Sequence, residues 1–160
     1  MKLSEWGRKL LEKLGFRSGH TCIETNGVSE VARGHAMCPR NFGSLDDFQG
    51  HARVTGPCGD TIEIWLAVEG GIVSGISFVT TGCGPSMASG SMATTLAKGR
   101  SVEDAAALRQ KDVLDALQGL PAESEHCALL AVNTIKAACD DYMERRKGDM
   151  GNGHQRSGEL

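Results

Sequence analysis

The chain has 160 residues, of which 40% are hydrophobic and 23% are charged, and its formal net charge is -3. A chain of this length and hydrophobic content can bury one core, so we expect one main soluble domain. It offers no basic surface for nucleic acid or an anionic membrane, and no apolar run suits a bilayer span or a secretory signal. We therefore expect a cytoplasmic protein whose six cysteines are reduced and act as ligands, redox groups or core residues.

The first 26 residues form a segment of their own. Leu3, Trp6, Leu10 and Leu14 recur at helical spacing with charged residues around them, which predicts an amphipathic helix over residues 1–16. Its acidic residues argue against a mitochondrial presequence. The polar residues that follow are typical of a linker, so we expect residues 1–26 to be a docking helix with its linker.

The next part of the chain predicts a sheet. A short helix is expected over residues 29–37, ending before Pro39, because the residue before a proline disfavours helical geometry. Apolar residues then alternate with others at the two-residue period of a half-buried strand, and Gly70 and Gly71 can form a tight turn. Three strands are expected, over residues 51–57, 61–69 and 72–80.

Helices dominate the remainder of the chain. Pro85 suits the first turn of a helix that continues over residues 86–97, and Ser101 with Asp104 resembles a capping box. Further helices are expected over residues 110–117 and 124–146, and a disordered tail over 148–160. Strands grouped before helices predict an α+β fold, in which a three-stranded antiparallel sheet packs against helices within a domain spanning residues 27–147.

Three cysteines lie at the ends of these predicted elements. Cys58 is separated from Asp60 by one glycine, and in extended chain the two side chains would lie on the same side. Cys83 and Cys127 lie at helix starts, where unpaired amides and the helix dipole favour a thiolate. Apolar residues four and eight positions after Cys127 predict that it faces inward. His126 precedes Cys127, so we expect these five residues to form one metal site.

The types of the predicted ligands limit which metal could bind but do not identify one. Three thiolates with one oxygen or nitrogen ligand suit zinc or an iron-sulfur cluster. A carboxylate is a harder ligand than a thiolate, so it should leave a sulfide cluster more readily, which suits a carrier. The chain has no Cys-x-x-Cys pair, which argues against a redox dithiol protein, and Cys139 is expected in the core.

The motifs together resemble a known family. Cys58-Gly-Asp60, Gly-Cys83-Gly and Leu120-Pro121 followed by His126-Cys127 are similar to the IscU/NifU-type iron-sulfur cluster assembly scaffolds, over about residues 39–146. The absence of a long insertion between the last two cysteines, together with the preceding histidine, is closer to the IscU type than to the zinc-dependent SufU type. The resemblance implies a SufE/NifU-like fold and a non-catalytic scaffold for a [2Fe-2S] cluster built from iron and desulfurase-derived sulfur.

The resemblance also implies roles for the site residues and for partners. Cys58, Cys83 and Cys127 would be cluster ligands and persulfide acceptors, Asp60 the labile ligand, and His126 an alternative ligand. The partners would be a cysteine desulfurase and apo iron-sulfur proteins, with a ferredoxin, a frataxin-like protein and a second copy of the chain as further candidates. Zn²⁺ could occupy the isolated apo-protein, and the alternative function is that of a zinc-dependent, SufU-like sulfurtransferase.

The chain departs from the family in one stretch and one extension. The family's chaperone-binding sequence Leu-Pro-Pro-Val-Lys reads Leu-Pro-Ala-Glu-Ser over residues 120–124, with the lysine lost and an acid gained. Recognition by an Hsp70-type chaperone is therefore not carried over. The segment of residues 1–26 has no counterpart in the short IscU form, so the resemblance implies nothing about its role.

Overall fold

The computed structural model describes residues 27–152. The predicted docking helix and linker, and residues 153–160 of the predicted tail, lie outside the described residues. The elements in chain order are α2 (Glu30–Met37), β1 (Gly50–Thr55), β2 (Thr61–Glu69), β3 (Ile72–Thr80), α3 (Gly84–Ala97), α4 (Val102–Ala106), α5 (Gln110–Ala116), the 3₁₀ helix η1 (Ala122–Ser124) and α6 (Glu125–Asn152).

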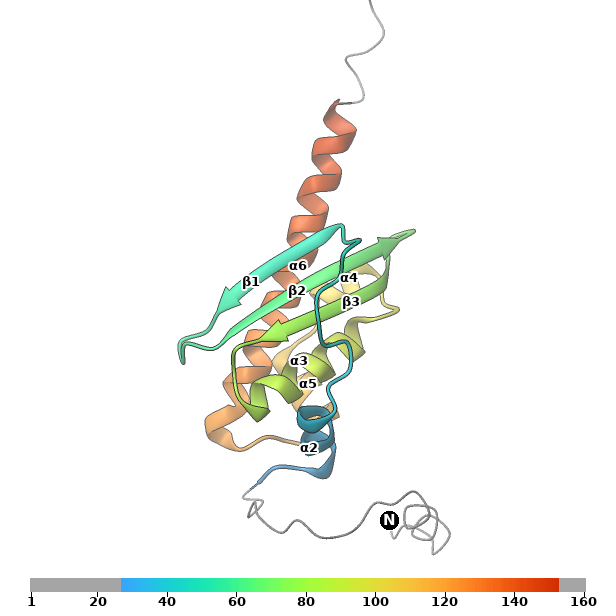
Figure 1. The fold of residues 1–160 in the computed structure, drawn as a ribbon. Coiled ribbons are helices and arrows are strands. Elements are labelled where there is room, and N and C mark those ends of the chain that lie inside the picture. Colours follow the sequence, from blue (N-terminus) through green and yellow to red (C-terminus); the bar gives the residue numbers. More distant parts are fainter. Residues whose placement is uncertain (1–26, 153–160) are drawn as a thin grey trace, which may run out of the picture.

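The three strands form an antiparallel sheet in the order β1-β2-β3. Ile62, Ile64 and Leu66 of β2 are fully buried while their neighbours are only partly buried, as the alternation predicts. Helices α3 and α6 pack on this buried face, and α6 extends beyond the sheet (Figure 1). The predicted α+β architecture is confirmed. Between residues 27 and 152, no helix combines the length and apolar character that crossing a membrane requires.

The segment between α2 and β1 crosses the other face of the sheet (Figure 1). It is fastened at the edge of β3, where the Phe78 N–H donates to the Asn41 carbonyl and the Gly43 N–H donates to the Phe78 carbonyl. At its far end, the Gln49 N–H donates to the Leu66 carbonyl at 2.7 Å. The segment is therefore hydrogen-bonded to the sheet at both of its ends.

Helix α3 approaches β3 more closely than a side chain at residue 90 would permit. A Cβ placed on Gly90 would lie 2.5 Å from Cδ2 of Phe78, whose ring is fully buried. Buried small residues, among them Ala88, Ser89 and Ala93, continue along α3, which also packs on α6. Close packing of these small residues therefore holds α3, including its first turn, against the sheet and α6.

The helix boundaries differ from the sequence prediction mainly at the end of the chain. Helix α6 continues to Asn152, past the expected end at residue 146 and into the predicted tail. The two glycines in this stretch, Gly148 and Gly151, do not stop the helix, and the ion pair between Arg145 Nε and Asp141 at 2.9 Å supports the exposed turns before them. At α4, the Asp104 N–H donates to Ser101 Oγ at 3.0 Å, which is one half of the expected capping box.

We predict that Gly90→Ala lowers the free energy of unfolding by about 1–3 kcal/mol, because its methyl group overlaps the buried Phe78 ring. Urea unfolding followed by circular dichroism measures the change. Gly34→Ala in α2 is the matched control, since a Cβ there meets no atom within 4 Å and should leave stability unchanged or slightly raised. Equal stability of the two variants would contradict the close-packing account.

Candidate functional site

Three separate segments carry the predicted ligands, and they meet at one end of the sheet. They are the turn between β1 and β2, the junction between β3 and α3, and the start of α6 (Figure 1). The strand pairing sets this arrangement, because Thr55 pairs with Thr61 at the mouth of the turn and Ile62 pairs with Thr80 at the end of β3. The topology therefore gathers residues that lie far apart in sequence.

The turn that carries Cys58 and Asp60 is tight rather than extended. The Gly56 N–H donates to the Asp60 carbonyl at 2.8 Å, and the Gly59 N–H donates to the Gly56 carbonyl at 3.0 Å. Gly59 has φ of 87°, a conformation that favours glycine. The expectation of an extended chain here was wrong, because two strands pair on either side and the chain must reverse. Cys58 is exposed at this turn.

Cys83 is the residue immediately before the first turn of α3. It caps the helix with extended backbone, its carbonyl accepts from the Met87 N–H at 3.0 Å, and Pro85 lies within the first turn as predicted. The Cys83 side chain is exposed. The thiol therefore lies beside the free amides of a helix N-terminus, where a solvent-accessible sulfur can be reached by a partner.

Cys127 belongs to the first turn of α6 and faces inward, as the helical pattern predicts. Only 2% of its surface is exposed. The 3₁₀ helix η1, which the sequence analysis did not predict, leads directly into this turn. The side-chain amide of Gln110 donates to the Glu125 carbonyl at 2.9 Å and so ties α5 to the start of α6. Cys127 is the buried member of the three cysteines.

The side chain that joins two of these segments is Ser86, which the sequence analysis missed. Its Oγ donates to Asp60 Oδ2 at 2.6 Å and lies 3.4 Å from Cys127 Sγ. Ser86 itself is fully buried. The signal available in the sequence was its position in the first turn of α3, three residues after Cys83, but a serine among so many small residues does not stand out.

Gly82 makes the contact between Asp60 and Ser86 possible. A Cβ placed on Gly82 would lie 2.5 Å from both Asp60 Oδ2 and Ser86 Cβ. The Asp60 carboxylate and the Ser86 hydroxyl therefore fill the space that a side chain at residue 82 would need. A side chain at residue 82 would push the two groups apart.

Burial and the neighbouring residues together shift the pKa of the Cys127 thiol. Burial raises the pKa of the Cys127 thiol, the nearby Ser86 hydroxyl lowers it, and negative charge on Cys58, Cys83 and Asp60 raises it further. A buried thiol surrounded by potential anions is poorly ionised on its own. A metal cation would reverse this balance, because binding to a thiolate releases the proton.

His126 and Cys139 lie in different environments. His126 is exposed, and its Nε2 lies 3.7 Å from Cys127 Sγ. Cys139 is fully buried in the core, where burial raises its pKa to about 12. Within residues 27–152, no three His, Cys, Asp or Glu side chains are already close enough to hold one metal ion. Asp60 and Cys127 therefore form the anchored half of the predicted site, and Cys58 and Cys83 form its exposed half.

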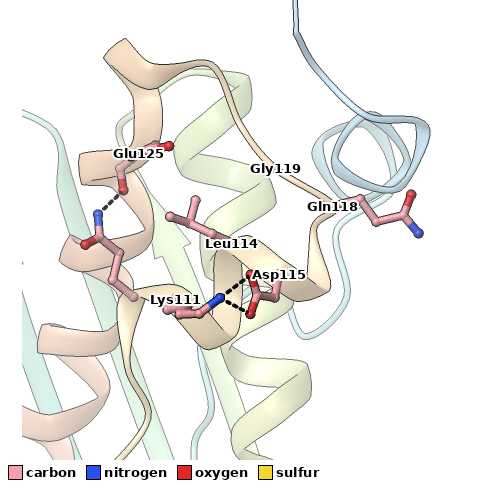
Figure 2. Close-up of a pocket in the computed structure, with 7 residues that line it drawn as sticks. Lys111, Leu114, Asp115, Gln118, Gly119 and Glu125 are labelled. Carbon is pink, nitrogen blue, oxygen red and sulfur yellow. Dashed lines mark hydrogen bonds and ion pairs between the residues drawn. The ribbon is translucent and has the colours of Figure 1, made fainter.

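A pocket of about 490 Å³ lies beside the start of α6 but contains none of the predicted ligands (Figure 2). Its rim includes the ion pair between Lys111 and Asp115 at 2.8 Å. The residues that line it are Gln110, Lys111, Leu114, Asp115, Gln118, Gly119 and Glu125. The pocket therefore adjoins the start of α6 without including the three cysteines or Asp60 in its lining.

Comparisons with known proteins find similar sequences over most of the described residues. Residues 28–149 match the family model for the NifU-like N terminal domain. The chain is 38% identical over 112 residues to iron-sulfur cluster assembly scaffold protein IscU 1 of Archaeoglobus fulgidus, covering 69% of this chain and 73% of that protein. It is also 38% identical over 124 residues to IscU of Escherichia coli K12, covering 74% of this chain and 96% of that protein.

Solved structures show the same fold. The N-terminal part of a NifU-like protein from Brucella abortus has a TM-score of 0.60 at 17% identity and covers 73% of this chain and 94% of its own. The SufU protein of Fervidobacterium islandicum AW-1 has a TM-score of 0.58 at 16% identity and covers 69% and 95%. At these identities the likeness concerns the fold alone.

We predict that iodoacetamide labels Cys58 and Cys83 at least about tenfold faster than Cys127, because burial both covers the Cys127 sulfur and raises its pKa. Peptide mass mapping after timed labelling of the folded protein measures the rates. Exposed Cys38 is the positive control and buried Cys139 the negative control. Labelling of Cys127 as fast as Cys58 would contradict the buried placement.

Proposed function

Because this chain belongs to the IscU/NifU-type family of iron-sulfur cluster assembly scaffolds, we propose that it assembles a [2Fe-2S] cluster and passes it to apo-proteins. The cluster is cargo, so the site must bind it and also release it. The observation that best supports the proposal is that the three segments carrying Cys58, Cys83 and Cys127 come together at one end of the sheet. Asp60 adds one oxygen donor, held there by the hydroxyl of Ser86.

The types of the proposed ligands suit a cluster that is bound temporarily and then released. Thiolates are the preferred ligands of iron in sulfide clusters, whereas a carboxylate is a harder and weaker partner. Asp60 would therefore be the ligand that leaves first, with exposed His126 as the alternative ligand that can take its place. Three firm ligands and one exchangeable ligand hold the cluster until a recipient offers its own cysteine.

The exposed cysteines suit the supply of sulfur. In persulfide transfer, a thiolate of Cys58 or Cys83 attacks the outer sulfur of a desulfurase persulfide, and the desulfurase thiolate leaves. Reducing that sulfur to sulfide takes two further electrons. A cysteine desulfurase is therefore the proposed sulfur-donating partner and a ferredoxin the proposed source of electrons, with a frataxin-like protein and a second copy of the chain as further proposed partners.

A zinc-dependent sulfurtransferase is the second candidate, because three thiolates and a carboxylate also match a tetrahedral zinc site. In that case zinc would hold the site and one cysteine would accept persulfide sulfur. The discriminating measurement is zinc content during desulfurase turnover. Retained zinc with stimulated turnover supports the sulfurtransferase, and loss of zinc as the cluster forms supports the scaffold.

We predict that anaerobic incubation with iron(II), cysteine, a desulfurase and a reduced ferredoxin as electron source gives the wild-type chain an iron-sulfur absorption spectrum with matching iron and sulfide content. Serine is a poor substitute for a thiolate ligand, so Cys58→Ser, Cys83→Ser and Cys127→Ser should each abolish a stable cluster. Cys38→Ser, which changes an exposed cysteine of the α2 end, is the control and should load normally. Tight zinc binding without any chromophore would sink the scaffold proposal.

We predict that Asp60→Ala makes the bound cluster several-fold longer lived and its transfer to an apo-ferredoxin several-fold slower, because the exchangeable ligand is gone. Decay of the cluster absorption and the appearance of holo-ferredoxin measure the two rates. Faster loss of the cluster from the variant would mean that Asp60 holds the cluster rather than aiding its release.

A further inference from the structure

Ser86 contacts two of the proposed ligands with one hydroxyl. Its Oγ lies 2.6 Å from Asp60 Oδ2 and 3.4 Å from Cys127 Sγ, and the residue is fully buried. A serine hydroxyl has one proton to donate, and sulfur is a weak acceptor. The much shorter distance to the carboxylate indicates that the proton is donated to Asp60.

The surroundings show that this contact is built into the site. Gly82 leaves open the space that Asp60 Oδ2 and Ser86 occupy, since a Cβ there would lie 2.5 Å from each. Ser89, one turn further along α3, is equally buried, but its Oγ has no hydrogen-bond partner within the described part of the chain. The bond to Asp60 is therefore specific to Ser86 and does not follow from a serine-rich helix.

We propose that Ser86 is a positioning residue that makes Asp60 an exchangeable ligand, an inference that rests on the proposed ligand role of Asp60. A carboxylate that leaves a metal in a partly buried site must find another donor for its charge. The Ser86 hydroxyl is such a donor, at the length of a charge-assisted O–H···O⁻ bond. The exchange moves the carboxylate between metal and hydroxyl and changes no covalent bond.

The inference makes a directional prediction. Without the hydroxyl, Asp60 has no partner when it leaves the metal, so it stays bound and release slows. The hydrogen bond acts only through Asp60. Removing the hydroxyl should therefore change nothing once the carboxylate is gone.

The test measures release of Zn²⁺, used as the probe metal, from the loaded full-length protein to a chromophoric chelator by stopped flow. We expect Ser86→Ala to release zinc about tenfold more slowly than the wild type, the scale of a hydrogen bond to a charged group. Ser86→Gly removes the same hydroxyl and is measured beside it, so that an unfolded alanine variant does not leave the question open. Ser86→Thr keeps a hydroxyl and should restore the wild-type rate.

Two controls separate this role from a structural one. Ser89→Ala removes a buried hydroxyl of the same helix that has no partner, and it should release zinc at the wild-type rate. Adding Ser86→Ala to Asp60→Ala should leave the rate of the single Asp60 variant within about twofold. An effect of Ser86→Ala that persists without Asp60, or no slowing in the hydroxyl-free variants, would overturn the inference.

The outcomes also distinguish this inference from the proposed function. A wild-type chain that holds zinc, with Ser86→Ala at the wild-type release rate, contradicts the role of Ser86 and leaves the ligand set standing. A wild-type chain that retains no zinc and assembles no cluster contradicts the ligand set, and the role of Ser86 fails with it.

Discussion

Helix α3 lies against β3 at a separation that only glycine allows, because the Phe78 ring occupies the space of a Cβ at residue 90. The same condition recurs at the start of the helix, where Gly82 leaves room for Asp60 and Ser86. Both glycines let α3 lie close to the sheet, and α6 packs on the same face of the sheet and against α3. The relative positions of Cys83 and Cys127 depend on this packing.

This packing divides the predicted site into an anchored half and an exposed half. Cys127 is buried and shares the Ser86 hydroxyl with Asp60, so these groups are held by the core of the protein. Cys58 and Cys83 are exposed at a turn and a helix start. Such a division suits a scaffold, because sulfur and iron must enter from outside while part of the site keeps its place.

Much of the fold could be predicted because it follows local rules. The alternation in β2 identified the buried face, the glycine pair identified the turn to β3, and the spacing after Cys127 placed that residue inward. The likeness to a family then implied which cysteines belong together. These predictions rest on patterns that neighbouring residues in the sequence carry by themselves.

The parts that sequence reasoning missed depend on contacts between distant segments. The turn at Gly59 arises from the pairing of β1 with β2, which a motif of three residues does not reveal. The contact of Ser86 with Asp60 exists only in the folded chain, where α3 places the two residues together although they are 26 positions apart in sequence. The late end of α6 reflects exposed helix-forming residues and an ion pair that outweigh the low helix propensity of Gly148 and Gly151.

The central claim is that three cysteines and one carboxylate hold a [2Fe-2S] cluster at one end of the sheet. Mössbauer spectroscopy of the protein reconstituted with ⁵⁷Fe tests it most directly, because the spectrum resolves the ligands of each iron. Three sulfur donors and one oxygen donor make the two irons unlike, so the account predicts two distinct ferric sites in equal amounts. Two identical sites, or iron bound without sulfide, would contradict it.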